Sequence, residues 1–166
     1  FLHPDEGACL YQLARTASAL GPSLEVGSYC GKSTLYLGTG ARDGGGLVYA
    51  LDHHRGSEEH QLGEEYHDAE LYDEQLQLMD SLPTFRRTLA LAQLESTVLP
   101  IVASSAHAGR YWQTPLALVF IDGGHSHAAA LTASEAEAAQ AAPKLSLTLT
   151  LALALNLAPS PSPNPS

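Results

Sequence analysis

The sequence predicts a doubly wound α/β fold with a parallel sheet, and three observations support this prediction. Short apolar runs of strand length alternate along the chain with stretches of helical periodicity. The run over 47–51 (LVYAL) is almost continuously apolar, which is typical of a strand buried on both faces of a parallel sheet. Glycine, serine or an acid follows each run, and open α/β sheets bind ligands at such strand ends. Strands separated by helices further favour right-handed crossovers.

The individual elements follow from local signals. Pro4 suits the first turn of a helix, and the Gly21-Pro22 pair ends it. On this helix Cys9 is assigned to an apolar face and is expected in the core. In order, the expected elements are a helix over 4–20, a strand over 23–26, a helix over 32–41, a strand over 47–51, a polar loop over 53–67, helices over 69–79 and 83–94, a strand over 98–103, a helix over 106–112, a strand over 116–121 and an alanine-rich helix over 126–142.

The C-terminal part of the chain differs in composition from the rest. Leucine alternates with small residues over 144–157, a pattern that fits either one β-strand or low-complexity sequence without an evolved fold. We favour low complexity, because so monotonous a repeat specifies no packed core. We therefore expect an incomplete domain over 1–142 and a disordered tail over 143–166. The chain begins with Phe1, so we expect its true N-terminus to lie upstream.

Composition limits the class of partner. The 166 residues, 45% of them hydrophobic, fit one globular domain with a core of its own. The formal charge of −10 disfavours binding to nucleic acid or to anionic membrane surfaces. Acids cluster over 58–80, where no Lys or Arg occurs. This cluster is interpreted as a solvated face or, alternatively, as a lid that selects a neutral or cationic substrate.

The two cysteines, Cys9 and Cys30, form neither a disulfide framework nor a zinc-binding spacing. No signal peptide is recognisable at the start of the sequence. We therefore expect a reducing compartment, the cytoplasm. The oligomeric state cannot be predicted from these features.

The segment LEVGSYCGKST joins a predicted strand to a predicted helix through a glycine turn. Gly27 and Gly31 would let a ligand approach the backbone, and N–H groups at the helix start would hold a carboxylate or a phosphate. The Gly-x-x-x-Gly spacing fits poorly with the dinucleotide fingerprint, and Val26 stands where a phosphate-binding loop needs glycine. An ordinary strand–helix turn is the alternative.

Asp52 ends the next strand, about 25 residues after Gly27. An acid at this position can accept both hydroxyls of an adenosine ribose, and a helix cap is the alternative. His53 and His54 follow, either lining a pocket or lying in solvent. At the third strand end, Ser104 and Ser105 would flank an adenine edge or cap a helix.

The fourth strand delivers FIDGGHSH to the same end of the sheet. Asp122 would orient a methyl donor, bind a cation or hold a substrate. His125 would act as a general base, because the ordinary pKa of histidine, about 6.5, suits proton transfer near neutral pH. A supporting or capping role is the alternative for His125.

Together LEVGSYCGKST, VYALDHH and VFIDGGHSH resemble class I S-adenosylmethionine-dependent methyltransferases, in the subgroup whose fourth strand ends in Asp-Gly-Gly-His. The resemblance covers roughly residues 4–130 and implies a Rossmann-like, three-layer α/β/α fold. It implies that S-adenosyl-L-methionine is the cofactor and that its methyl group passes to an oxygen or nitrogen of a small-molecule or sugar-like acceptor. The implied cofactor contacts are Glu25, Gly27, Ser28 and Gly31 for the methionine part, Asp52 for the ribose, and Ser104 and Ser105 for the adenine. His53, which follows Asp52, is included as a further cofactor-binding residue. Asp122 and His125 would face the transferred methyl group.

The sequence departs from this pattern after Ala130. Thr132-Ala133-Ser134 and the leucine repeat replace the expected acid, Gly-Gly turn and later strands. We therefore expect a fragment or an aberrant C-terminus that lacks the last strands. Asp122 alone makes no metal site, so a divalent cation has no support in the sequence. The alternative functions are an inactive cofactor-binding domain and, less favoured because the spacing of Gly27 and Gly31 argues against it, a nicotinamide-dependent oxidoreductase.

Overall fold

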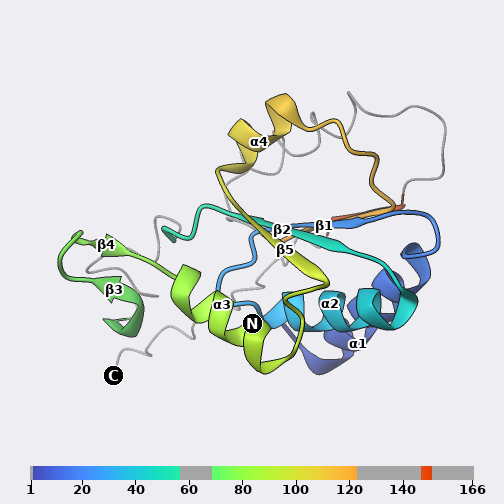
Figure 1. The fold of residues 1–166 in the computed structure, drawn as a ribbon, viewed down its shortest axis with the longest axis horizontal. Coiled ribbons are helices and arrows are strands. Elements are labelled where there is room, and N and C mark those ends of the chain that lie inside the picture. The colour runs from blue at the N-terminus through green and yellow to red at the C-terminus, as the bar shows by residue number, and fades with distance from the viewer. Residues whose placement is uncertain (1, 57–68, 123–146, 151–166) are drawn as a thin grey trace, which may run out of the picture.

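In the computed structural model, residues 2–56, 69–122 and 147–150 are described. A five-stranded parallel sheet runs in the order β5-β2-β1-β6-β7 (Figure 1). This confirms the predicted doubly wound, Rossmann-like fold. The strands of this sheet are β1 (Ser23–Val26), β2 (Val48–Asp52), β5 (Val98–Val102), β6 (Leu118–Ile121) and β7 (Leu147–Thr150).

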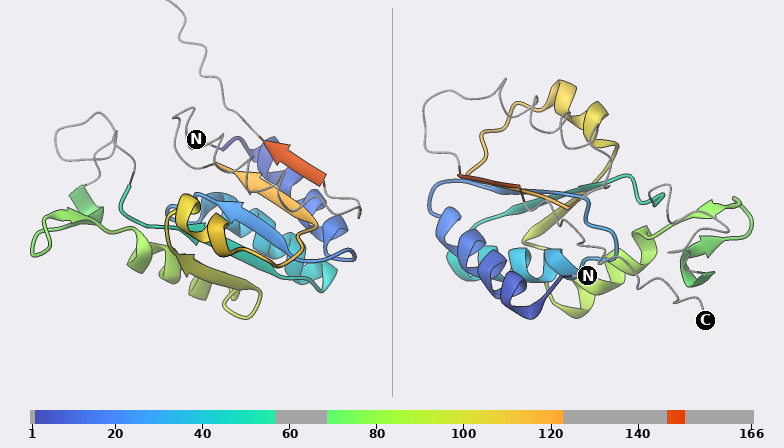
Figure 2. Two further views of the ribbon diagram at one scale, coloured as in Figure 1. Left: turned by 90° about the horizontal axis from the view of Figure 1, so that it is seen from above. Right: turned by 180° about the vertical axis from the view of Figure 1, so that it is seen from behind.

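Helices lie on both faces of the sheet, so the domain has three layers. The helices of the lower layer are α1 (Pro4–Ala17), α2 (Lys32–Gly44) and α3 (Leu82–Leu91), and the helix of the upper layer is α4 (Ser105–Tyr111). In Figure 1, α1, α2 and α3 lie below the sheet and α4 lies above it, and Figure 2 shows the same layers from above and behind.

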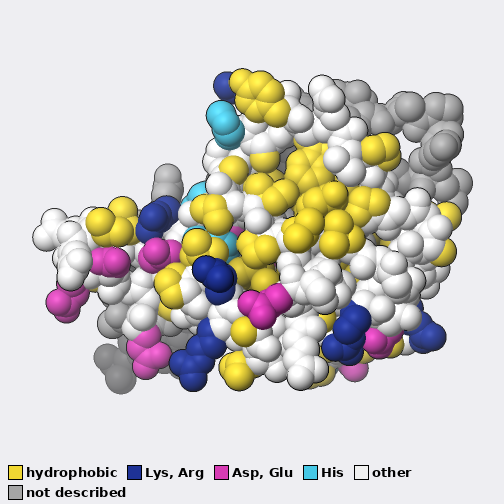
Figure 3. All heavy atoms as spheres, in the orientation of Figure 1, with side chains coloured by type: hydrophobic (Ala, Val, Ile, Leu, Met, Phe, Trp, Pro, Cys, Tyr) yellow, Lys and Arg dark blue, Asp and Glu magenta, His cyan; other side chains and the backbone are white. Residues whose placement is uncertain are grey.

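The strand residues alternate between two apolar clusters, as the period of two in a β-strand requires. The lower cluster packs α1, α2 and α3 against Val48, Ala50, Leu118 and Phe120. The upper cluster is built on Leu24, Leu51, Val119 and Ile121, with Trp112 packed edge-on against Tyr49. Hydrophobic side chains gather below α4 in Figure 3, where this upper cluster reaches the surface.

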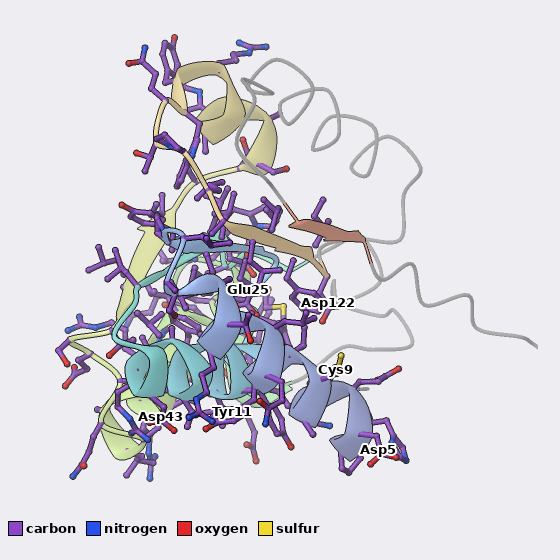
Figure 4. The ribbon with its side chains drawn as sticks, turned by 90° about the vertical axis from the view of Figure 1, so that its right-hand side faces the viewer. Asp5, Cys9, Tyr11, Glu25, Asp43 and Asp122 are labelled. Atoms are coloured by element: carbon purple, nitrogen blue, oxygen red, sulfur yellow. The ribbon has the colours of Figure 1, made fainter. Side chains whose placement is uncertain are left out.

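Helix α1 buries a stripe formed by Gly7, Leu10, Ala14 and Ala17. Cys9 is exposed, so the prediction that it belongs to the core was wrong. Cys9 directly precedes Leu10, and successive helix positions are rotated by about 100°. Its side chain therefore points away from the stripe, as Figure 4 shows at the surface of α1.

The predicted helix over 69–79 was wrong. A short 3-10 helix, η2 (Ala69–Leu71), is followed by an antiparallel hairpin of β3 (Tyr72–Asp73) and β4 (Leu78–Met79). The Asp73 carboxylate accepts the backbone N–H groups of Gln75 and Leu76 at 2.9 and 3.0 Å. Such a local side-chain turn competes with helix formation.

The remaining boundaries lie close to the prediction. Helix α2 extends past the predicted end at residue 41 to Gly44, and α3 ends at Leu91 rather than at residue 94. Leu147–Thr150 is a strand that pairs in parallel with β6, which is the alternative we did not favour for the leucine repeat. The predicted helix over 126–142 lies outside the described residues, and the domain boundary at 142 stays a prediction.

Candidate functional site

The sheet register brings two acids to either side of the first glycine turn. Val26 at the end of β1 is paired with Leu51 of β2 and with Ile121 of β6. The residues that follow β1 and β6 continue this register. Gly27 N–H donates to the Leu51 carbonyl at 2.9 Å, and Asp122 N–H donates to the Val26 carbonyl at 2.8 Å. Asp52 and Asp122 therefore flank Gly27 at the carboxyl end of the sheet.

The turn from β1 to α2 depends on glycines in left-handed conformations. Gly27 has φ 89° and Gly31, the N-cap residue of α2, has φ 94°. A Cβ atom at position 31 would lie 3.1 Å from Thr88 Cγ2 and 3.2 Å from Phe85 Cδ2. Gly31 is thus required by its backbone conformation and by packing against α3, in addition to the ligand access expected from the sequence.

Ser28, inside this turn, has a buried hydroxyl group. Its side chain is 2% exposed, and its Oγ has no hydrogen-bond partner among the described residues. Burying a hydroxyl without a partner is unfavourable, so a polar ligand that reached the turn would gain a ready hydrogen bond. This feature fits a cofactor with a polar group at the turn.

Glu25 is completely buried beneath the turn. Its two carboxylate oxygens accept hydrogen bonds from Ser33 Oγ and Thr34 Oγ1, each at 2.5 Å. Burial raises the pKa of Glu25 to about 7 against the opposing effect of the two hydroxyls, and the negative charges of Asp122 and Asp52 raise it further. The carboxyl group links β1 to the first turn of α2, and in Figure 4 it lies in the interior while Asp122 lies at the end of β6.

Asp52 joins the ends of β1 and β2. Its Oδ2 accepts the backbone N–H of Tyr29 at 2.8 Å, and its Oδ1 accepts the backbone N–H of His54 at 2.7 Å. Both donors have positive φ, 46° for Tyr29 and 58° for His54, which residues with side chains rarely adopt. Each carboxylate oxygen has about two acceptor positions, so both oxygens retain capacity for a ligand hydroxyl.

The two histidines after Asp52 differ in environment. His53 is exposed, and its Nδ1 accepts the Arg55 N–H at 3.0 Å. His54 is 1% exposed, its Nδ1 lies 2.9 Å from Ser81 Oγ, and its ring packs on Phe85 with centroids 5.2 Å apart. Burial lowers the pKa of His54, against the raising effect of Asp52 and Asp80. Both histidines were candidates for lining a pocket, but only His53 was expected among the cofactor contacts, because nothing in a run of loop residues indicates which one turns inward.

The remaining predicted site residues are less constrained. Ser104 caps α4 by accepting the His107 N–H at 3.2 Å, and Ser105 is half-buried beside it. The capping alternative is therefore correct for Ser104, and a cap does not exclude contact with a ligand. Asp122 is exposed, and His125 lies outside the described residues.

The described residues contain no group of three or more His, Cys, Asp or Glu side chains arranged to hold a metal ion. Within the same residues, no helix is both long enough and apolar enough to cross a lipid bilayer.

Strand β1 ends in a glycine turn, and an acid stands at the end of each of its neighbours, β2 and β6. A doubly wound sheet with this arrangement is a ligand-binding α/β domain of the Rossmann-like class. A family model described as a methyltransferase domain matches residues 24–146, and the chain belongs to that family.

Solved structures share this fold. The cofactor-bound structure of Rv0187 from MTB has a TM-score of 0.54 and 21% identity over 82% of this chain and 52% of its own. An O-methyltransferase from Bacillus cereus in complex with SAH has a TM-score of 0.55 and 20% identity over 81% and 52%. The SAH-bound methyltransferase PaMTH1 of Podospora anserina has a TM-score of 0.56 and 16% identity over 82% and 49%. The chain thus spans about half the length of these solved relatives.

Proposed function

We propose that this chain binds S-adenosyl-L-methionine at the carboxyl ends of β1, β2 and β6 and supports transfer of its methyl group to an acceptor. The observation that carries the proposal is the geometry of Asp52. Two backbone N–H groups hold its carboxylate in one orientation at the carboxyl end of β2, next to the β1 strand at which the strand order reverses, and its oxygens retain acceptor capacity for a ribose diol. Family membership and the SAH-bound structures of similar proteins support the same cofactor.

The other residues take their roles from their places around Asp52. Gly27, Ser28 and Gly31 would surround the methionine part, with the Ser28 hydroxyl as a donor. Glu25 would support this turn from beneath, because its side chain is completely buried and its oxygens accept from Ser33 and Thr34. His53 would lie beside the ribose, and Ser104 and Ser105 would lie near the adenine.

The cofactor supplies a methyl group already activated on a sulfonium centre. The protein then has to hold the acceptor in line with that group, and proximity accounts for much of the rate enhancement. Asp122, next to Gly27, would orient the acceptor, and His125 would accept a proton from its hydroxyl or amine. The acidic surroundings of Gly27 favour a cationic donor.

We place the acceptor among small molecules with a nucleophilic oxygen or nitrogen. The similar structure from Bacillus cereus is an O-methyltransferase in complex with SAH, which supports oxygen as the acceptor atom. The Asp-Gly-Gly-His subgroup and a cytoplasmic location stay predictions.

Calorimetric titration of the full chain with S-adenosylmethionine and S-adenosylhomocysteine tests the proposal. Asp52→Ala should weaken binding by about 10- to 100-fold, the equivalent of roughly 1–3 kcal/mol for a lost buried hydrogen-bond partner. Glu95→Ala, which removes an exposed acid on the loop after α3, is the matched control and should bind like the native chain. Unchanged affinity in Asp52→Ala would contradict the proposed site.

Release of S-adenosylhomocysteine in the presence of phenolic, sugar and amine acceptors then tests methyl transfer. Turnover with one class would identify the acceptor. Tight binding with no turnover across all classes would instead indicate a cofactor-binding domain without activity of its own.

A further inference from the structure

The side chain of His54 is enclosed although it belongs to a polar, charged segment. It is 1% exposed, and its Nε2 has no hydrogen-bond partner among the described residues. The ring lies between Ser81, which hydrogen-bonds to Nδ1 at 2.9 Å, and Phe85, whose ring centroid is 5.2 Å away. The side chain is therefore anchored on the start of α3 rather than directed to solvent.

The backbone of His54 is held at the same place. Its φ of 58° lies in the left-handed region, where a residue with a Cβ atom is disfavoured unless the surrounding structure enforces it. The Ser81 N–H donates to the His54 carbonyl at 3.1 Å, so Ser81 binds both the side chain and the main chain of this residue. Arg55, the next residue, adds contacts to the Met79 carbonyl at 3.3 Å and to Asp80 Oδ2 at 3.4 Å.

This anchored conformation directs the His54 N–H at Asp52. The N–H donates to Oδ1 at 2.7 Å, and the opposite oxygen, Oδ2, accepts from Tyr29 at 2.8 Å. Because the carboxylate is one rigid group, a change at Oδ1 is transmitted to the contact at Oδ2.

We infer that His54 is a positioning residue for Asp52: its buried ring, fixed by Ser81 and Phe85, keeps the strained turn in the conformation that orients the carboxylate. The consequence for ligand affinity rests on the proposed role of Asp52 in holding the cofactor ribose. The orientation of the carboxylate itself exists in the free protein and is measurable there.

Hydrogen exchange of the full chain without ligand, followed by NMR, tests this role. His54→Ala should accelerate exchange of the Tyr29 amide by about 10-fold or more, since loss of a hydrogen bond raises the open population by about that factor. Gln93→Ala is the matched control, because Gln93 also has a positive φ, 56°, and is exposed at the far end of α3. Gln93→Ala should leave the exchange rate of the Tyr29 amide unchanged. Equal protection of Tyr29 in native and His54→Ala proteins would overturn the inference.

A double-mutant cycle separates positioning from a general effect on the fold. His54→Ala should weaken binding of S-adenosylhomocysteine about 10-fold in the native background but less than about 3-fold in the Asp52→Ala background. Equal losses in both backgrounds would show that His54 does not act through Asp52. If His54→Ala does not fold, Ser81→Ala removes only the hydroxyl that anchors the ring and enters the same measurements. If the native chain binds no cofactor, the proposed function fails, while the exchange result still decides the role of His54.

Discussion

Helix α2 has a glycine with positive φ at each end, Gly31 with φ 94° at the N-cap and Gly45 with φ 72° at the C-cap. At the C-terminal end, Gly45 and Gly46 donate to the carbonyls of Arg42 and Ala41 and close the helix in the usual glycine cap. Nothing lies within 4 Å of a Cβ atom built at Gly45. This glycine is therefore needed only for its backbone conformation.

The N-terminal end uses its glycine for more than backbone conformation. A Cβ atom at Gly31 would press against Thr88 and Phe85 on α3, and the same turn is joined to β2 through the Tyr29–Asp52 contact. The buried carboxyl of Glu25 holds the first turn of α2 from beneath. The comparison shows that similar glycine signals in a sequence can mark a simple helix end or a turn tied to three other elements.

The largest effect is expected at Gly40, where α2 contacts the backbone of α1. A Cβ atom at Gly40 would collide with the Tyr11 carbonyl oxygen, which belongs to the backbone of α1 and cannot move alone. Gly40→Ala should lower the free energy of unfolding by about 3 kcal/mol or more, as in strong overpacking. Urea titration measures this change. An increase in stability, which alanine brings at an unconstrained helix position, would show that the two helices separate easily.

Gly31→Ala should have the next largest effect. We expect a loss of about 2–3 kcal/mol, from the left-handed backbone and from contact with Thr88 and Phe85 together. The same urea titration measures it. A loss no greater than that of Gly45→Ala would show that packing against α3 adds nothing at this end of the helix.

Glu25→Gln should change the pH dependence of stability. Because the pKa of Glu25 is raised from 4.5 to about 7, the folded chain binds the proton more tightly than the unfolded chain does. Its contribution to stability is therefore complete below pH 4.5 and is lost as the pH rises through about 7. At about 1.4 kcal/mol per unit, the shift from 4.5 to about 7 corresponds to a loss of at most about 3.5 kcal/mol. Glutamine stays neutral, so the variant should lose less stability than the native chain on this rise.

Thermal unfolding of both proteins between about pH 5 and pH 8.5 measures this difference. The melting temperature of Glu25→Gln relative to the native chain should rise with pH. A constant offset across the range would mean that Glu25 keeps an ordinary pKa in the folded chain.

Gly45→Ala should have the smallest effect. No side chain or backbone atom opposes the added methyl group. The free energy of unfolding should therefore fall only by the cost of an alanine in the left-handed conformation, about 1 kcal/mol. Cofactor affinity should be unchanged, as this end of α2 is remote from the carboxyl ends of the strands. A weaker cofactor complex would show that the two ends of the helix are coupled.

Strands β1, β2 and β6 were predictable because each is a short apolar run that ends at glycine or an acid, whereas β7, in the leucine repeat, was not the favoured interpretation. Asp52 and Asp122 directly follow such runs, so their meeting at one edge of the sheet follows from the parallel order. The hairpin over 72–79 was not predictable from periodicity, because its turn depends on the hydrogen bonds that the Asp73 carboxylate accepts from the Gln75 and Leu76 N–H groups. The burial of His54 was also not predictable, since it depends on Ser81 and Phe85, which are far away in the sequence.

Strand β5 lies at the edge of the described sheet and carries two exposed apolar side chains, Leu99 at 43% and Val102 at 56% exposure. An apolar edge of this kind is a template onto which another extended chain can add. Pro100 interrupts the row of backbone N–H groups on this edge, because proline has no N–H. Proline is accommodated in a sheet where its nitrogen faces away from the neighbouring strand. The row of donors along this edge is therefore broken at its centre, which protects the molecule from strand-by-strand aggregation.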